Sequence, residues 1–310
     1  MKSFLKYSKE IGNNFLLTQG PGGNTSTKIS ENIYIKKSGM HLSDSVNNSI
    51  FQKVNLNKII SFYETNKNNQ KFEEGLSIET PIHVLLDEKH VFHYHSISSL
   101  IISAITKKDK LDDFLYKRKI QPINYFRPGY ELAKEILKKN NKEEINSFFL
   151  YSHGMVVSGN NLRNIRSRIY KIENEFEKLI DYKRLEQLLD LVQINYDTEK
   201  KQTFIPNPLP NLNYEVFNNL YFFPDHAVFL PFSFCKDNNL IKKNKNIIFF
   251  NKEKLYLNKC LDETEKIYLK VLLTICSYID SKKIYNVINK KTGDNLRKSD
   301  DEILRIRVNK

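Results

Sequence analysis

The sequence predicts an α/β sandwich, and three observations lead to this prediction. Segments with helical and extended patterns alternate between residues 25 and 189, which is typical of helices packed on a sheet. The hydrophobic fraction of 40%, with 12% aromatic residues, is enough for a full core in a chain of 310 residues. Beyond a proline-rich stretch near residue 205 the pattern becomes less regular. We therefore expect a main domain over residues 1–204 and a C-terminal extension of strands and a helix over residues 205–310, packed on it.

The first predicted elements are a glycine-rich turn and a β-hairpin. The turn is "QGPGG", and the strands are "TSTKI" (25–29) and "IYIKK" (33–37), joined by "SEN". Residues 47–66 are predicted as one helix, followed by a short polar turn. A second helix is predicted over residues 77–89, because its apolar residues recur at helical spacing and Ser77 is a suitable N-cap.

The middle of the chain alternates between the two patterns. In chain order we predict a strand over 91–96, a helix over 100–107, a helix over 128–140, two buried strands within 145–159 and a long helix over 160–189. The helix at 128 begins with a proline, which the first turn of a helix tolerates because its N–H has no partner there. Gly154 marks the break between the two buried strands.

The C-terminal extension has fewer regular patterns. Three prolines mark its beginning: Pro206, Pro208 and Pro210. Residues 221–230 and 246–258 are predicted as strands. Residues 263–279 are predicted as an amphipathic helix, because four β-branched residues fall on one stripe, namely Ile267, Val271, Ile275 and Ile279.

Composition argues against several classes of function. The net charge of +13 comes from lysines spread over the whole chain, without an aromatic and basic motif for nucleic acid. We expect no nucleic-acid partner, and local lysines favour a small anionic substrate. No stretch approaches the roughly 18 apolar residues of a membrane span, and the first residues do not resemble a signal peptide. Three sparse cysteines, Cys235, Cys260 and Cys276, fit a reducing compartment, so we expect a cytoplasmic protein without membrane attachment.

Two histidines stand one residue apart in the apolar run "VFHYHS". On a strand, His93 and His95 point to the same face, with Cα atoms about 6.5–7 Å apart. Two imidazoles at this spacing can bind one cation. The same pair also fits two hydrogen-bonded core histidines, and the spacing alone does not decide between the two.

A third histidine and a glutamate favour the metal site. His153 follows a predicted buried strand, and α/β sheets usually place their sites at strand ends. Three histidines leave an open coordination position, which is typical of catalytic sites. Glu79 lies four residues before His83 on a predicted helix that leads into the His93 strand, where it can act as a ligand or a base. A glutamate at a helix N-terminus is also explained by the helix dipole alone.

Two glycine-containing turns suggest a site for an anion. Gly20, Gly22 and Gly23 precede Asn24 and Ser26, and "KKSG" (36–39) closes the hairpin. Glycines expose backbone N–H groups, and serine and asparagine add donors. Together the turns suggest a phosphate cradle, although each is also an ordinary hairpin turn. Neither matches the spacing of a P-loop or a dinucleotide-binding fingerprint.

Six motifs in order resemble the class II aldolase/adducin family: "GPGGNTSTK", "IKKSG", "SIETPIH", "FHYHS", "RPGYEL" and "LYSHGMVVSG". The similarity extends to the family's longer branch, which includes the aldolase part of bifunctional rhamnulose-phosphate aldolase/dehydrogenase proteins, through "FPDHAVFL" and "DDEILRIR". It spans residues 12 to 307. The resemblance implies a three-layer α/β/α sandwich around a mainly antiparallel central sheet and a homotetramer.

The resemblance also implies a set of site residues. The ligands of a divalent cation, normally Zn²⁺, fall on His93, His95 and His153, and the acid/base glutamate on Glu79. The implied phosphate cradle comprises Gly23, Asn24, Ser38, Gly39 and Ser77. Ile78 stands where shorter relatives have a second cradle serine, which leaves open whether the substrate is phosphorylated. Tyr125 matches a proton donor that a neighbouring subunit contributes in some aldolases, and His226 is an added candidate without an assigned role.

The implied activity is cleavage of a ketose, expected as its 1-phosphate, to dihydroxyacetone phosphate and an aldehyde through an enediolate. A sugar-phosphate dehydratase or an epimerase of the same family is the alternative, although such epimerases tend to carry aspartate at the position of Glu79. The other alternative is a non-catalytic, adducin-like scaffold. Such scaffolds lose the histidine ligands, whereas this chain has all three.

Overall fold

The computed structural model describes residues 1–46, 48–66, 70–140, 145–205, 218–236, 246–250, 255–279 and 282–309. A seven-stranded sheet forms the centre of the main domain, with strand order β3-β2-β1-β4-β7-β6-β5. Every neighbouring pair is antiparallel except β5 and β6. Its strands are β1 (Asn24–Ile29), β2 (Asn32–Lys36), β3 (Phe51–Asn55), β4 (His90–Tyr94), β5 (Gln121–Ile123), β6 (Ile145–Leu150) and β7 (Gly154–Gly159).

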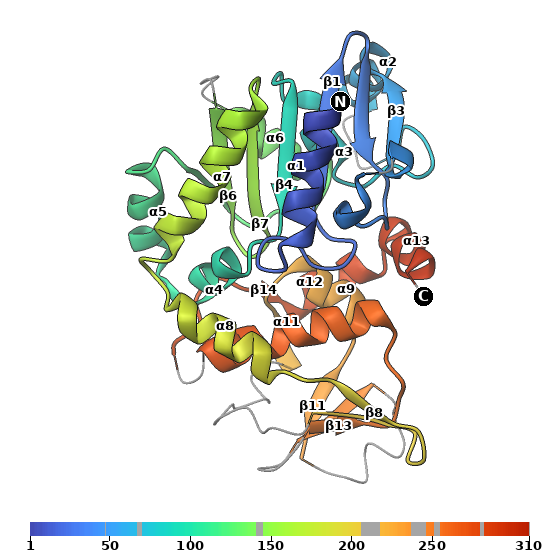
Figure 1. Ribbon diagram of the computed structural model, residues 1–310, viewed down its shortest axis with the longest axis vertical. Coiled ribbons are helices and arrows are strands. Elements are labelled where there is room, and N and C mark those ends of the chain that lie inside the picture. Colours follow the sequence, from blue (N-terminus) through green and yellow to red (C-terminus); the bar gives the residue numbers. More distant parts are fainter. Residues whose placement is uncertain are drawn as a thin grey trace.

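Helices cover both faces of this sheet (Figure 1). One face packs against α1 (Lys2–Asn13), α4 (Ile97–Ile105) and α7 (Leu162–Phe176), and the other against α2 (Leu56–Asn66), α3 (Thr80–Leu85) and α6 (Tyr130–Lys139). Successive residues of a central strand face opposite layers, since Phe92 joins the cluster under α4 and α7 while Val91 joins the cluster under α3 and α6. The predicted sandwich around a mainly antiparallel sheet is confirmed.

Three predicted helices in the main domain are wrong in extent. The helix predicted over 77–89 is the shorter α3. The residues predicted as one helix over 47–66 form a short 3-10 turn (Asn48–Ile50), β3 and then α2. Pairing with β2 along the whole of β3 overrides the local helical pattern there. The predicted long helix over 160–189 is two helices, α7 and α8 (Tyr182–Leu191), because the Asp181 side chain caps a new helix by accepting the Arg184 N–H.

Among the described residues before α7, four further elements were not predicted. They are α1, the 3-10 turn Leu42–Asp44, α5 (Lys108–Tyr116) and β5. The predicted strands at 25–29, 33–37, 91–96 and within 145–159 correspond to β1, β2, β4, β6 and β7, and the predicted helices at 100–107 and 128–140 correspond to α4 and α6.

The described residues after α8, called the C-terminal segment below, have their own sheet, with strand order β11-β12-β13-β9-β8. These strands are β8 (Asn195–Asp197), β9 (Gln202–Ile205), β11 (Ser233–Cys235), β12 (Ile247–Phe250) and β13 (Leu255–Leu257). A two-stranded pair, β10 (Leu220–Tyr221) with β14 (Ile288–Asn289), lies beside α12 (Lys290–Arg297), and α13 (Asp300–Val308) follows. The prolines predicted to mark the boundary lie outside the described residues, and the division at residue 204 stays a prediction.

The strand predicted over residues 221–230 is wrong. Only β10 is extended, and Pro224–Phe229 forms the helix α9, all six residues of which are buried. Proline is favoured in the first turn of a helix, and a helix buried on all sides shows no amphipathic spacing that would separate it from a strand. The predicted strands within 246–258 are confirmed by β12 and β13, and the helix over 263–279 by α11 (Glu263–Ile279).

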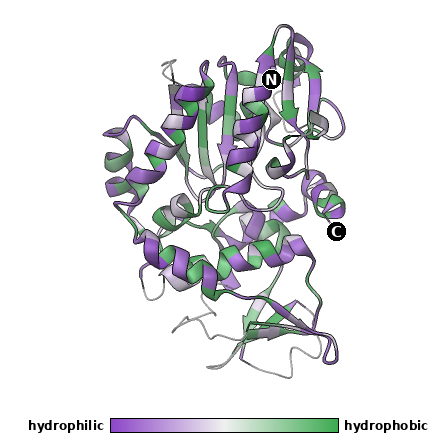
Figure 2. Ribbon diagram, in the orientation of Figure 1, coloured by the Kyte–Doolittle hydropathy of each residue, from purple (hydrophilic) through white to green (hydrophobic). Residues whose placement is uncertain are grey.

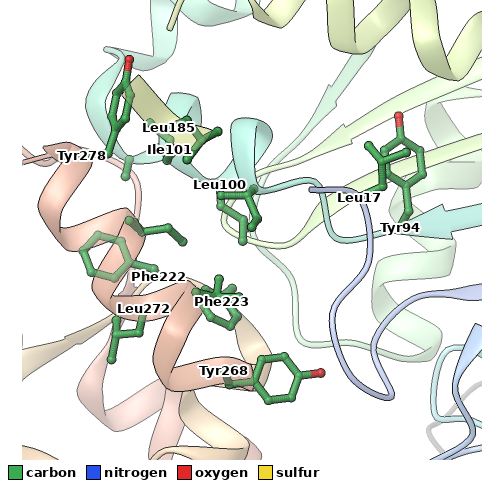
Figure 3. Packing of buried hydrophobic residues seen from close by; sticks show 14 of the residues in the cluster. Leu17, Tyr94, Leu100, Ile101, Leu185, Phe222, Phe223, Tyr268, Leu272 and Tyr278 are labelled. Carbon is green, nitrogen blue, oxygen red and sulfur yellow. The ribbon is translucent and has the colours of Figure 1, made fainter. Parts of the chain in front are cut away.

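Helix α11 joins the C-terminal segment to the main domain. It packs against α4, α8 and α9, and residues of all four helices belong to one hydrophobic cluster. Figure 3 shows side chains of this cluster from α4 (Leu100), from α11 (Leu272) and from the residues just before α9 (Phe222). Hydrophilic residues alternate with hydrophobic ones along α7 and α8, as expected for helices with one buried side (Figure 2). Among the described residues, no helix combines the length and apolarity that a membrane crossing requires.

Candidate metal centre

The two neighbouring histidines lie at the end of the central strand. β4 pairs with β1 on one side and β7 on the other, so that His93 is opposite Asn24 and Val156. Because side chains alternate along a strand, His93 points to the α3 side of the sheet. β4 ends at Tyr94, and His95 lies just beyond it. Both imidazoles are buried, at 0% and 4% exposure, which confirms that the pair lies in the core.

His153 is brought beside them by the turn between β6 and β7. The turn ends at Gly154, whose φ is +139°, and a Cβ there would lie 2.4 Å from the carbonyl oxygen of Tyr94. Only glycine permits this close approach of β7 to the end of β4. The ring centroid of His153 consequently lies 4.8 Å from that of His93 and 5.3 Å from that of His95.

Glu79 reaches the same point from the start of α3. It occupies the N-cap position in place of the predicted Ser77, whose hydroxyl instead accepts the Glu79 N–H at 3.2 Å. Pro81 follows in the first turn of the helix. The Oε1 atom of Glu79 lies 3.3 Å from Nε2 of His93 and 3.1 Å from Nε2 of His153.

The four side chains form one buried donor cluster, with a ligand atom from each within 4.8 Å of all the others. The Nε2 atoms of His93 and His95 are 3.0 Å apart. Zn–N bonds of about 2.0–2.1 Å place the nitrogens of a tetrahedral site at a similar separation of about 3.3 Å. Nδ1 of His93 donates to the carbonyl of Met155 at 2.9 Å, which leaves the Nε2 lone pair directed at the cluster.

Unpartnered atoms and ionisation states also fit a cation. Within the described parts of the chain, Oε1 of Glu79 and Nδ1 of His153 are buried without a hydrogen bond of normal geometry. Burial lowers the pKa of His95 to about 4 and also lowers that of His153, so both rings are neutral at pH 7. Burial also lowers the pKa of His93, but the neighbouring Glu79 raises it above its usual value. Burial raises the pKa of Glu79, but His93 and His153 together hold it well below its usual value, so Glu79 is a carboxylate. The residues present therefore fit a divalent metal ion.

The predicted phosphate cradle lies on the wall of the same pocket. Gly23, Ser38, Gly39 and Ser77 line it together with Glu79 and His153, and so does Ile78. Asn24 is not among the lining residues, but its Oδ1 is buried and, within the described residues, has no hydrogen-bond partner.

The pocket itself is small. Its volume is about 20 Å³, which is room for a single water-sized group. Helix α13 contributes Asp301, Glu302 and Arg305 to the lining, and a Cβ at Gly39 would lie 2.9 Å from Val308. The C-terminal helix therefore covers the predicted cradle.

Two other predicted residues lie outside the pocket lining. The hydroxyl of Tyr125 is buried and finds no partner among the described residues of its own chain. His226 packs against Tyr221, Phe222 and Phe223, and its Nδ1 accepts the Phe222 N–H at 3.2 Å. Within one chain, the structure does not bring the side chain of Tyr125 or His226 to the donor cluster.

Several charged residues at the pocket were not predicted. Lys36 is 2% exposed and donates to the carbonyls of Pro21 and Met40, and burial lowers its pKa to about 7. Asp225 and Arg305 come from the C-terminal segment. They lie in the sequences "FPDH" and "ILRIR". A charged residue inside an apolar run is the feature that could have indicated a buried, functional charge at these positions.

Comparison with known proteins identifies the family of the first part of the chain. Residues 3–180, more than half of the chain, match the model of the Class II Aldolase and Adducin N-terminal domain family. The N-terminal class II aldolase domain of a conserved protein from Thermoplasma acidophilum aligns with a TM-score of 0.51 at 24% identity, covering 57% of this chain and 92% of that one. L-fuculose-1-phosphate aldolase from Thermus thermophilus aligns with a TM-score of 0.43 at 17% identity, covering 60% and 98%.

A curated relative is much longer than the shared region. The uncharacterized oxidoreductase YuxG of Bacillus subtilis (strain 168) is 27% identical over 106 residues. These residues are 34% of this chain and only 15% of YuxG.

Proposed function

The chain belongs to the class II aldolase and adducin N-terminal domain family, and from this membership we propose that it is a divalent-metal-dependent aldolase. The proposed substrate is a ketose 1-phosphate, and the products are dihydroxyacetone phosphate and an aldehyde. The observation that supports this most is the buried cluster of three imidazoles and one carboxylate within 4.8 Å of one another. Zn²⁺ is the proposed cation, bound by His93, His95 and His153.

When bound, the cation supplies Lewis-acid stabilisation of the negative charge that develops as the C3–C4 bond breaks. In the cleavage direction the C4 hydroxyl would pass its proton to the ionised carboxylate of Glu79, and the C3–C4 electron pair would pass to the carbonyl as an enediolate. Glu79 is the proposed group that returns a proton to C3. Its carboxylate is buried, ionised and held at the pocket by the N-terminus of α3, which favours a fixed position for proton transfer.

Anchoring of the phosphate is the proposed role of Gly23, Asn24, Ser38, Gly39 and Ser77. Backbone N–H groups and hydroxyls at these turns, with the nearby amino group of Lys36, offer hydrogen-bond donors to an anion. The pocket of about 20 Å³ is too small for a triose phosphate. We propose that the pocket opens when the substrate binds, and that α13, which lies against Gly39, is one of the parts that move.

We also propose a homotetramer in which Tyr125 serves the site of a neighbouring subunit. Its buried hydroxyl lacks a partner among the described residues of its own chain. Mixing Tyr125→Phe subunits with Glu79→Gln subunits should restore measurable cleavage, because some mixed sites then contain both native residues. Two inactive variants that remain inactive after mixing would argue against sharing between subunits.

Metal analysis and a substrate panel test the proposed function. Purified protein should contain zinc or take it up after treatment with a chelator, whereas less than a tenth of an equivalent with no uptake would favour the scaffold alternative. A panel of ketose 1-phosphates should then release a triose, measured with a coupled dehydrogenase. Loss of water without triose release would identify a dehydratase instead. A cytoplasmic location stays a prediction that rests on the sparse cysteines.

A further inference from the structure

A carboxylate of the C-terminal segment contacts a proposed metal ligand. Oδ2 of Asp225, on α9, lies 3.1 Å from Nδ1 of His95. The same oxygen accepts a hydrogen bond from the hydroxyl of Tyr268 at 2.7 Å, and Oδ1 lies 2.7 Å from Nη1 of Arg305. Asp225 is completely buried, and Figure 3 shows the Tyr268 hydroxyl pointing away from α11 toward the N-terminal loop.

We propose that Asp225 is a positioning residue that fixes His95 as a metal ligand, so that the C-terminal segment completes a site whose ligands all lie within residues 3–180. The inference rests on the proposed metal site but not on the identity of the substrate. A carboxylate oxygen can only accept here, so Nδ1 of His95 carries the proton and Nε2 keeps its lone pair for the cation. A carboxylate in this position orients the ring and raises the basicity of the ligating nitrogen.

The three histidines differ in how their second nitrogen is held. His93 donates to a backbone carbonyl, and the second nitrogen of His153 has no partner in the described chain. Of the two histidines at the end of β4, only His95 lies past the last residue of the strand, where the β-ladder no longer fixes the backbone. The contact with Asp225 supplies the orientation that the sheet supplies to His93.

A glycine of the N-terminal loop makes room for this contact. A Cβ at Gly22 would lie 2.8 Å from Nδ1 of His95 and 3.1 Å from Oδ2 of Asp225. Any larger residue would therefore push the imidazole and the carboxylate apart. The loop is held at the same point by Tyr268, whose hydroxyl also lies 3.1 Å from the carbonyl oxygen of Gln19. The loop at Gly22, helix α9 and helix α11 thus meet at the contact between His95 and Asp225.

Metal affinity, measured by competition with a coloured chelator, tests the proposal without any substrate. We expect Asp225→Asn to weaken zinc binding by about 10–100-fold, which is the usual effect of removing such a partner. Gly22→Ala should act in the same direction. The matched control is Asp294→Asn, because Asp294 accepts a 2.7 Å hydrogen bond from Tyr221 in the same segment without contacting the cluster. The control should bind zinc with unchanged affinity.

A second measurement remains informative if Asp225→Asn does not fold. In the zinc-loaded wild-type protein, long-range ¹H–¹⁵N spectra should show His95 ligated through Nε2, with a slowly exchanging proton on Nδ1. Ligation through Nδ1, or Asp225→Asn affinity within threefold of wild type, would overturn the proposal while leaving the aldolase intact. A wild-type protein that binds no zinc would instead overturn the proposed function.

Discussion

Acid should destabilise this protein in part through one histidine that lies outside the metal cluster. His226 is 4% exposed, and its ring packs among three aromatic side chains. Because its Nδ1 accepts the Phe222 N–H, the folded protein holds the neutral ring, with its proton on Nε2. Burial lowers the pKa of His226 from 6.5 to about 3.

The direction and size of the effect follow from linkage. Between pH 6.5 and about 3 the unfolded chain binds a proton at His226 that the folded chain does not, so the free energy of unfolding falls as the pH falls through this window. The contribution of His226 is therefore complete above pH 6.5. At pH 5, which is about 1.5 units below the pKa of the unfolded chain, the free energy of unfolding is lower by about 2 kcal/mol.

Urea unfolding of the metal-free protein at pH 7 and pH 5, followed by far-UV circular dichroism, measures this loss. The comparison is with His226→Asn, whose side-chain oxygen can still accept the Phe222 N–H but does not titrate in this range. Wild type should lose about 2 kcal/mol more than the variant between the two pH values. Equal losses in the two proteins would refute the assignment of a neutral, buried His226. His83 and His90, whose pKa values burial also lowers, affect both proteins alike.

Three further predictions concern the site. Glu79→Gln should retain zinc but slow cleavage by about 10²–10⁴-fold. The variant should also lose proton exchange at C3 of dihydroxyacetone phosphate in D₂O. Full exchange in the variant would show that Glu79 does not transfer this proton. Gly154→Ala should lower the free energy of unfolding by about 2–6 kcal/mol, because alanine would have a strained φ and its Cβ would lie 2.4 Å from the carbonyl oxygen of Tyr94. A loss of less than about 1 kcal/mol in a urea titration would contradict this contact. Asn24→Ala should mainly raise KM for a ketose 1-phosphate, whereas an unchanged KM would favour a substrate without phosphate.

The central part of the fold was predictable because its signals are local. The turn before Asn24, the spacing of His93 and His95 and the break at Gly154 all lie within a few residues of the features they indicate. The metal cluster could be anticipated for the same reason, since a strand fixes the relative directions of i and i+2 side chains. Glu79 needed only the short helix that leads into that strand.

Features set by distant pairing could not be anticipated in this way. β3 is defined by its pairing with β2, and α9 is buried on all sides, so neither shows the amphipathic pattern of its class. Asp225 lies 130 residues after His95, so the sequence does not show that the two residues are in contact. In "FPDH" the residue type that suggests a site is the neighbouring His226. The helix itself explains the outcome, because consecutive residues of a helix point in different directions: Asp225 faces the cluster while His226 faces the aromatic core.

The boundary of the shared family region is therefore not the boundary of the site. The proposed ligands come from residues 3–180, where the sheet fixes His93 and the β6–β7 turn places His153. The group that holds His95 comes from α9, and Tyr268 of α11 and Arg305 of α13 hold that group in turn. Moving α13 to admit a substrate would withdraw Arg305 from Asp225, whereas Tyr268 belongs to a helix packed into the main core. The hydrogen bond from Tyr268 can therefore keep Asp225 in contact with His95 while the pocket is open.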